Sequence, residues 1–280
     1  MSDIDAAIQL DVSKAITSAF QNRSVSECIS LFDNLEKALL EMPQIDAEGF
    51  QLKEWQSGGM YCRQITIPEG CLLTGRIYKR DHIEIMISGD ISIVSAEGVS
   101  KRYKGQNTIE AKAGKRQAGY AHKETVWMTI NLCPDKAEPD ERLDYTSVLT
   151  YKELNNYDYS KFLEEESLTE EEITGIVNTE DIIDMPKEFN HIYKDYSDID
   201  GEGLFSKKSI ARGDIICPVR IGNNRTIAGR YTNHSATGNA KPCFIDGEFV
   251  YIACCDISSN SEITSNYRLA LEVRRAEGDL

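Results

Sequence analysis

The sequence predicts a mainly β protein with helical additions (α+β), and three patterns point to this class. A chain of 280 residues is too long to fold around one small hydrophobic core, so more than one domain is expected. Residues 13–42 carry apolar side chains at helical spacing, whereas residues 61–132 alternate with a period of two. We expect a helical N-terminal segment (1–50), a small β domain (51–135), an acidic helical connector (136–188) and a C-terminal β domain (189–280).

The N-terminal segment contains a clear helix start. Ser24 and Glu27 stand three residues apart, which is the spacing of a capping box. Downstream, apolar residues recur at the spacing of one helix face, so we expect a core or dimer contact and not a ligand site. This stripe consists of Cys28, Leu31, Phe32, Leu35 and Leu39.

The first β domain is expected to be a small barrel or a sandwich, because short alternating segments are separated by turn residues about every ten positions. A strand that alternates in this way buries one face and exposes the other. The expected strands include residues 63–67, 83–87 and 126–130, and the expected turns are 68–70, 88–90 and 97–98.

The order of these turn and histidine positions resembles the cupin family, and in particular the cupin-like proteins that tailed phages encode. The resemblance rests on residues 67–70, Gly75, His82, residues 88–90, and the stretch from Lys112 to His122. It implies a β-barrel, a homodimer formed through that barrel, and a viral origin.

In metal-bearing cupins, histidines and a carboxylate from two stretches hold the metal. The residues that could correspond are His82, Glu84 (or Asp81) and His122, and period-two alternation places His82 and Glu84 on one side of a strand. Arg80 stands where a second histidine would be needed. We therefore expect these residues to be polar core or interface groups and do not expect a metal, while a cupin metalloenzyme acting on a small molecule stays open as the weakest alternative.

The connector carries most of the acidity of the chain. Residues 136–190 hold 16 acidic and 5 basic side chains, which is a net charge of 5 − 16 = −11. Ser167 and Glu170 have the spacing of a second capping box. We expect a few short helices in a solvated spacer, and a docking surface for a basic partner is the alternative.

Three motifs in the last third of the chain together resemble a SET domain. They are residues 201–205 (Gly-Glu-Gly-Leu-Phe), residues 230–235 (Arg-Tyr-Thr-Asn-His-Ser) with Gly238 and Asn239, and residues 262–267 (Glu-Ile-Thr-Ser-Asn-Tyr). SET domains are β-rich, β-clip folds that transfer a methyl group from S-adenosylmethionine to a protein lysine. The resemblance therefore implies a cofactor, a substrate class and a reaction.

The resemblance also implies site residues. Methyl transfer from a sulfonium is an in-line displacement, so alignment of the amine and exclusion of water matter more than acid–base chemistry. By resemblance, the backbone of Glu202, Gly203 and Leu204 and the side chains of Asn233 and His234 hold S-adenosylmethionine. The catalytic residues are Tyr267, whose hydroxyl lies by the methyl group and the amine, and Tyr231, a wall of the amine channel. The chain departs from the family at Gly238, where proline is common, and at Asn266, where aspartate is common.

Composition limits the other function classes. A net charge of −15 argues against a nucleic-acid partner, because such binding depends on Lys and Arg. No apolar run approaches the ~18 residues of a membrane helix, and the acidic N-terminus does not resemble a signal peptide, so a cytoplasmic protein is expected. The eight cysteines show no CxxC pair and are expected to be free thiols.

Two main functions follow. The first is an S-adenosylmethionine-dependent methyltransferase that modifies a protein lysine, and cofactor binding is its first test. The second is a non-catalytic binding or virion-assembly protein whose partners are phage structural proteins. For a viral protein the compartment would be the host cytoplasm or the virion.

Overall fold

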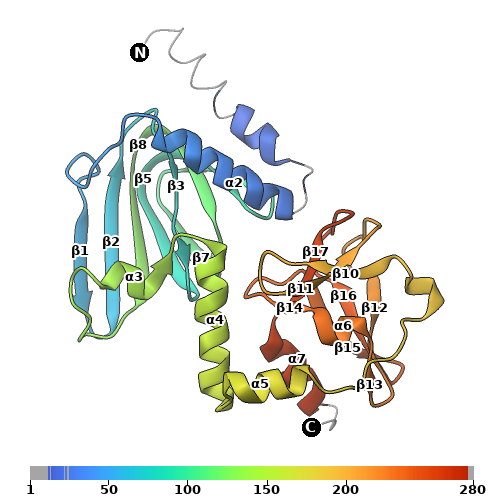
Figure 1. Ribbon diagram of the computed structural model, residues 1–280. Coiled ribbons are helices and arrows are strands. Elements are labelled where there is room, and N and C mark those ends of the chain that lie inside the picture. The colour runs from blue at the N-terminus through green and yellow to red at the C-terminus, as the bar shows by residue number, and fades with distance from the viewer. Residues whose placement is uncertain (1–11, 13, 22, 24, 277–280) are drawn as a thin grey trace. The chain divides into compact units, whose positions relative to one another are not determined.

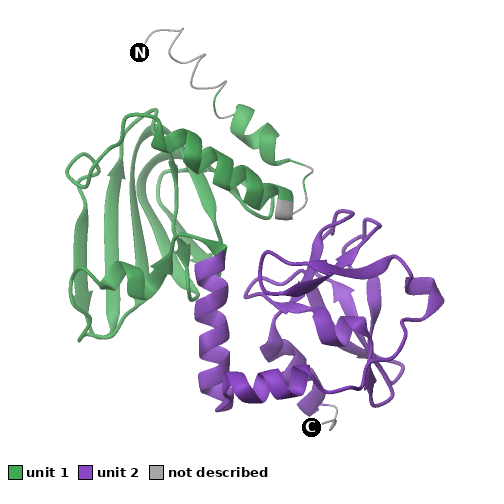
Figure 2. Cartoon of the chain, in the orientation of Figure 1, with its two compact units in different colours: residues 1–151 green, residues 152–280 purple. Residues whose placement is uncertain are grey.

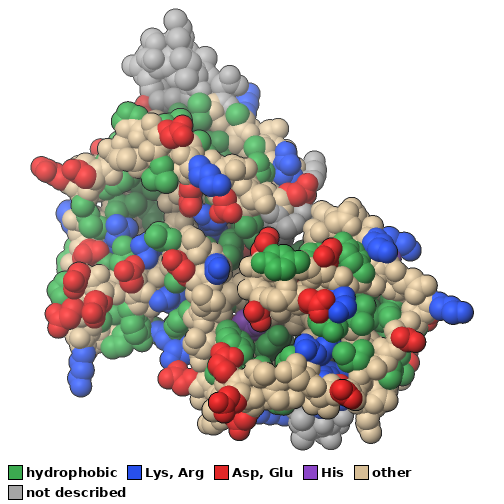
Figure 3. Space-filling view, viewed as in Figure 1, with side chains coloured by type: hydrophobic (Ala, Val, Ile, Leu, Met, Phe, Trp, Pro, Cys, Tyr) green, Lys and Arg blue, Asp and Glu red, His purple; other side chains and the backbone are tan. Residues whose placement is uncertain are grey.

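The computed structural model describes residues 12, 14–21, 23 and 25–276, and these form two compact units, residues 1–151 and 152–280 (Figure 2). The chain as a whole has more described residues in strands than in helices, as expected for a mainly β protein with helical additions (Figure 1). Every helix of the described residues is too short or too polar to cross a lipid bilayer. On the face seen in Figure 3, acidic and basic side chains are interspersed among apolar ones.

The first unit contains one large antiparallel sheet, a small two-stranded sheet and two named helices among its described residues. Residues 14–20 are also helical. Its elements are α2 (Val25–Leu40), β1 (Lys53–Ser57), β2 (Met60–Ile67), β3 (Leu72–Thr74), β4 (Ile77–Tyr78), β5 (His82–Ser95), β6 (Ser100–Lys104), β7 (Asn107–Ala111), β8 (Gln117–Leu132), α3 (Arg142–Thr146) and β9 (Ser147–Val148).

The large sheet of the first unit has two halves that share the long strands β5 and β8. In one half, β8 pairs with β2 and the first part of β5 pairs with β7. In the other half, β8 pairs with β3 and the second part of β5 pairs with β6. Apolar side chains from both halves pack into one core, which includes Ile67, Met86, Ile91, Ile93 and Trp127. The two halves therefore face each other across a common interior.

The turn expected at residues 88–90 is instead a bulge inside one continuous strand. Register shifts between β5 and β8 occur at Met86/Ser88, Ser88/Asp90 and Asp90/Ile91. Gly89 has φ +122°, and a Cβ there would lie 2.5 Å from the Cα of Thr125. Because only glycine fits this close approach, it bends the strand and continues it into the other half.

The apolar stripe of the N-terminal segment is a core contact. Cys28 and Phe32 of α2 are fully buried and pack with Phe20, Val94 and Ala118. Ser24, the expected helix cap, lies outside the described residues. The buried guanidinium of Arg116 holds the same helix through Asp33 at 2.8 Å and Glu36 at 2.5 Å.

The second unit contains one mixed sheet, four named α-helices and one 3-10 helix in the described part of the chain. Its elements are α4 (Tyr151–Glu166), α5 (Glu170–Val177), the 3-10 helix η1 (Lys187–Phe189), β10 (Ile192–Tyr196), β11 (Glu202–Ser206), β12 (Ile215–Ile221), β13 (Asn224–Arg225), α6 (Ile227–Tyr231), β14 (Asn233–His234), β15 (Ala240–Ile245), β16 (Glu248–Ala253), β17 (Glu262–Ser265) and α7 (Tyr267–Ala276).

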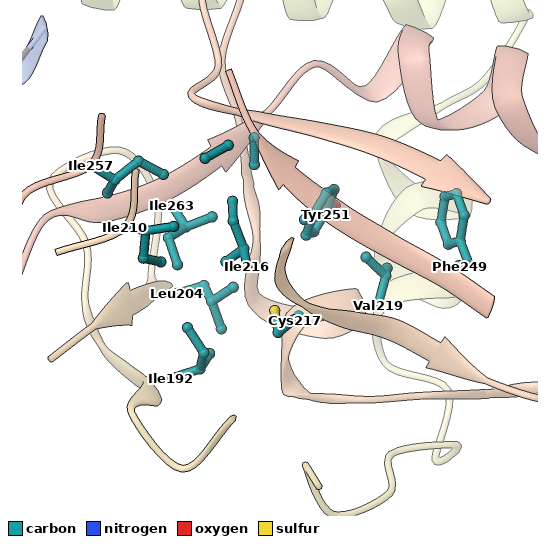
Figure 4. Packing of buried hydrophobic residues seen from close by; sticks show 13 residues of the cluster. Ile192, Leu204, Ile210, Ile216, Cys217, Val219, Phe249, Tyr251, Ile257 and Ile263 are labelled. Carbon is teal, nitrogen blue, oxygen red and sulfur yellow. The ribbon is translucent and has the colours of Figure 1, made fainter. Parts of the chain in front are cut away.

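Strand β17 organises the second sheet, whose order is β10-β11-β17-β15-β16-β12-β13. It is antiparallel to β11 but parallel to β14 and β15, with Asn233 opposite Thr264 and Ala240 opposite Ser265. The core beneath includes the fully buried Leu204, Ile216 and Ile263, which lie close together in Figure 4.

Of the expected connector (136–188), residues 136–151 fall in the first unit and residues 152–188 in the second, where α4 and α5 are the main helices. The capping box of α5 is formed by Thr169 and Glu172, not by Ser167 and Glu170. Both pairs have the required spacing, but Ser167 adopts φ +55° and so belongs to the turn that ends α4.

Candidate functional site

A cavity of about 590 Å³ in the second unit brings together most of the residues that the sequence singled out. Glu202, Tyr231, Asn233, His234 and Tyr267 line it, although they come from four different elements. Gly203 and Leu204 do not line it. The remaining lining residues are Asn155, Asn156, Tyr159, Glu170, Ile173, Thr174, Val177, Asn178, Ile199, Asp200, Gly201 and Arg230.

The cavity floor is shaped by the turn between β10 and β11. Gly201 has φ +47°, a left-handed conformation that suits glycine, and its carbonyl accepts the N–H of Ser197. Gly203 is needed for a different reason, since a Cβ there would lie 2.3 Å from Oε1 of Glu262. The side chain of Leu204 is fully buried in the core, so only its backbone is left to serve a ligand.

Asn233 ties this turn to β17. Its side-chain Nδ2 donates to Ser197 Oγ at 3.0 Å, to the carbonyl of Asp200 at 3.0 Å and to Glu262 Oε1 at 2.9 Å. Ser197 Oγ also donates to Glu262 Oε1 at 2.8 Å. Burial raises the pKa of Glu262 above its ordinary value, even though the hydrogen bonds from Asn233 and Ser197 oppose the shift.

The hydrogen bonds of His234 define its tautomer. The backbone N–H of Tyr267 donates to Nδ1 at 3.3 Å, so Nδ1 must carry a lone pair. Nε2 lies 3.1 Å from Oδ2 of Asp158, a carboxylate that can only accept. In this arrangement Nδ1 acts as the acceptor and Nε2 as the donor, so both ring nitrogens are engaged by the protein.

Tyr267 lies beside this histidine, and both side chains line the cavity. Its hydroxyl donates to the carbonyl of Thr232 at 3.2 Å, and burial raises its pKa to about 12. The ring centroids of His234 and Phe162 lie 5.0 and 5.9 Å away, at steep interplanar angles. The phenol stays protonated at neutral pH, so it can orient a ligand but is not a base.

Tyr231 forms a partly cationic corner of the cavity. Lys194 Nζ lies 4.6 Å from its ring centroid, and the guanidinium carbon of Arg230 lies at 5.0 Å. Lys194 also pairs with Glu202 at 2.9 Å. Arg230 in turn donates to Oδ1 of Asn178 at 3.0 Å.

The charged side chains that line the cavity are mainly acidic. They are Glu170, Asp200 and Glu202 against Arg230. This acidic rim, formed by Glu170, Asp200 and Glu202, favours the approach of a cationic group such as a lysine ammonium.

Both departures from the SET pattern have a local explanation. A Cβ at Gly238 would lie 2.8 Å from the Cα of Ser265 and from the carbonyl of Thr264, so the close approach of β17 excludes proline. Asn266 donates to Asp158 Oδ2 at 3.1 Å. An aspartate there would place two carboxylates together, which is unfavourable.

The cavity wall formed by α4 and α5 was not anticipated from the sequence. Asn155, Tyr159 and Ile173 lie on these helices, within the segment expected to be a solvated acidic spacer. The available signal was the run from Asn155 to Tyr159, in which amide and aromatic side chains interrupt the surrounding charges and Asp158 is the one charged residue. Tyr159 lies 5.7 Å from the ring centroid of His234, and burial raises its pKa.

The first unit has a separate cavity of about 740 Å³ between the halves of its sheet. His82 and Glu84 line it together with apolar residues such as Ile65, Ile93 and Trp127. His82 Nδ1 lies 3.2 Å from the carbonyl of Arg80, so in the neutral ring Nδ1 carries the proton and Nε2 a lone pair. That buried Nε2 has no hydrogen-bond partner and lies 3.5 Å from Glu84 Oε1.

His122 is not brought to His82 and Glu84. Its Nε2 lies 2.8 Å from Ser92 Oγ, on the face of the sheet opposite Ile91, Ile93 and the cavity. Burial lowers its pKa, and the nearby charge of Arg102 adds to the shift. Across the residues that the structure describes, no three His, Cys, Asp or Glu side chains are arranged to hold a metal ion.

Neither a protein-family model nor a curated protein matches the sequence. Among solved structures, a protein from Neisseria meningitidis is 13% identical, covering 35% of this chain and 96% of its own, with a TM-score of 0.27. KdgF from Halomonas sp. is 16% identical over 34% of this chain and 91% of its own, with a TM-score of 0.28. A Cupin 2 conserved barrel domain protein from Salinispora arenicola is 11% identical over 32% and 87%, with a TM-score of 0.26. These low scores assign no function to the chain.

Proposed function

We propose that the second unit is a SET-type methyltransferase that uses S-adenosylmethionine to methylate a lysine of another protein. One observation carries the proposal. Tyr231, Asn233, His234 and Tyr267 line a single cavity of about 590 Å³, within the usual size range of ligand and cofactor sites. Glu202, from the glycine-containing turn, lines the same cavity.

The cavity residues suit S-adenosylmethionine chemically. Tyr159, Tyr231 and Tyr267 offer aromatic faces to an adenine ring and to a sulfonium cation. Arg230 can pair with a carboxylate, and Asp200 and Glu202 can accept hydrogen bonds from an ammonium group or from ribose hydroxyls. When bound, the cofactor supplies an electrophilic methyl group.

The residues of the chain would act by orientation. The Tyr267 hydroxyl stays protonated and offers a fixed dipole near the reacting groups, while the acidic rim attracts the cationic substrate lysine. The partly buried aromatic wall of Tyr159, His234 and Tyr267 excludes water from that end of the cavity. The ammonium would release its proton to solvent before the attack, and the neutral amine would then displace S-adenosylhomocysteine from the methyl group. This in-line displacement depends mainly on alignment, so no strong base is needed.

Isothermal titration of S-adenosylmethionine and S-adenosylhomocysteine into the purified protein tests the proposal. We expect binding of both by the wild type. We also expect retained binding but lost methyl transfer in Tyr267→Phe. Tyr193→Phe is the matched control, because the Tyr193 hydroxyl bonds only to the surface residue Asn260 at 3.2 Å. Absence of binding by the wild type would end the enzymatic proposal.

A non-catalytic binding or virion-assembly protein is the second candidate. It is favoured by the engagement of Asn233 Nδ2 and both ring nitrogens of His234 with protein atoms, an arrangement that also suits a purely structural role. Cofactor-independent association with phage structural proteins, detected by mass spectrometry of virions, would support this candidate and the phage origin together.

For the first unit we infer a cupin-like barrel that binds a small molecule. The unpartnered Nε2 of His82 and the carboxylate of Glu84 are two acceptors that face each other, so a ligand with a hydrogen-bond donor would suit them. Mass spectrometry of small molecules released from wild type and His82→Ala tests this inference. Metal analysis of the same samples tests the weaker alternative of a metalloenzyme.

A further inference from the structure

Asp158 on α4 is the meeting point of three residues around the cavity. Its Oδ2 accepts hydrogen bonds from His234 Nε2 and from Asn266 Nδ2, both at 3.1 Å. Its Oδ1 accepts from Arg268 Nη1 at 2.6 Å, and its backbone carbonyl accepts from Arg268 Nη2 at 3.0 Å. Asp158 therefore links β14 to the start of α7.

This carboxylate remains ionised at neutral pH. Burial acts to raise its pKa, but the hydrogen bond from His234 and the charge of Arg268 outweigh it, and the net shift is downward. An ionised carboxylate can only accept hydrogen bonds, so it selects the form of His234 that carries a proton on Nε2. Nδ1 is then free to accept the backbone N–H of Tyr267.

The structure assigns Asp158 as the positioning residue that fixes the tautomer of His234 and, through it, the place of Tyr267 on the cavity wall; its bearing on methyl transfer rests on the proposed function. No catalytic role is implied, since Asp158 does not line the cavity. It comes from a helix that precedes all three SET-like motifs in the sequence, 76 residues before His234.

Replacing Asp158 with Asn tests the assignment, because asparagine has the same shape but can donate. If its amide nitrogen faces His234, the imidazole proton must move to Nδ1, and the bond from the Tyr267 N–H is lost. Glu165→Gln is the matched control. Glu165 pairs with Arg268 at 2.7 Å but has no contact with His234, and its side chain is 57% exposed.

The first readout is nitrogen NMR of the histidine rings in the full chain, which contains four histidines. The His234 signals are identified by their loss in His234→Gln. We expect the proton on Nε2 in the wild type and in Glu165→Gln, and a shift toward Nδ1–H in Asp158→Asn. A wild-type ring protonated on Nδ1, or an unchanged tautomer in folded Asp158→Asn, would overturn the assignment.

The second readout is methyl transfer. We expect Asp158→Asn to lose roughly tenfold in kcat with little change in KM for the cofactor, as expected when one hydrogen-bonding group is misaligned. Glu165→Gln should keep both values. A wild type that binds no cofactor defeats the proposed function, whereas the NMR result stands independently. The wild-type tautomer decides the question even where Asp158→Asn does not fold.

Discussion

Glu262 Oε1 lies so close to Gly203 that a side chain at this position would clash with it. A Cβ added to Gly203 would be only 2.3 Å from this oxygen. Glu262 cannot move aside freely, because Ser197 Oγ and Asn233 Nδ2 hold the same oxygen at 2.8 and 2.9 Å. Gly203 and Glu262 are therefore coupled by shape.

We predict that Gly203→Ala destabilises the protein by about 1–3 kcal/mol, because Glu262 must leave its hydrogen-bond partners. Urea denaturation measures the loss. The double variant Gly203→Ala/Glu262→Ala lacks the carboxylate with which the new Cβ would clash. Its loss of stability should therefore be smaller than the sum of the losses of the two single variants. Additive effects would show that the contact does not cause the loss.

The pH dependence of stability should reveal the buried Glu262. The pKa of Glu262 in the folded state is raised above the ordinary value of 4.5. The stability that its protonated carboxyl contributes is therefore fully present below that value and is lost as the pH rises through the raised folded-state pKa. Glu262→Gln should therefore gain stability over the wild type as the pH increases from 4 to 8. Glu248→Gln, at an exposed position on β16, should show no such trend.

Arg116 should be a main anchor of α2. Its side chain is 2% exposed and pairs with Asp33 and Glu36. Arg116→Ala should cost about 3 kcal/mol in thermal or urea unfolding, which is the cost of breaking a buried ion pair. Lys112→Ala removes the exposed pair with Asp81 and should cost much less than Arg116→Ala, because solvent screens this pair. Equal losses would argue against the anchor.

Self-association through the barrel is predicted from its outer face. Cross-strand register aligns Trp55, Cys62, Ile130 and Ile83 in one row, on the face opposite the cavity-lining Arg63, Glu84 and Thr129. Because Trp55 and Ile83 of this outer row are exposed apolar side chains, we expect a second copy to cover the outer face.

Light scattering of Ile83→Lys tests the homodimer. The variant should be monomeric where the wild type is dimeric. Val99→Lys changes an equally apolar side chain, 62% exposed, in the turn between β5 and β6 and should leave the dimer intact. A strictly monomeric wild type would remove the prediction.

The sequence predicted the elements whose side chains repeat with a clear period. The alternation of residues 63–67 and 126–130 lies within β2 and β8, and Cys28 and Phe32 of the expected stripe are buried in the core. Gly89 was misjudged, because a glycine between polar residues signals a turn and a bulge equally well. Only its close contact with Thr125 decides between them.

The site was harder to predict than the strands. Tyr231, Asn233, His234 and Tyr267 could be named from motif spacing, but the partners that fix their geometry could not. Asp158 lies in a helix whose polar residues look solvated, and nothing local indicates that this carboxylate meets His234. Such pairing depends on tertiary packing, which spacing along one segment does not encode.

The parallel pairing of β14 with β17 also bears on biosynthesis. Because β17 lies between β11 and β15 and leads into Tyr267 at the start of α7, the cavity lacks this lining residue until the ribosome has released almost the entire second unit. Residues 201–234 would meanwhile lack their central strand, with unpaired backbone groups at the edges of β11 and β15. The site is thus completed only after β17 and the start of α7 have been made, so a nascent chain should acquire ligand affinity in one late step.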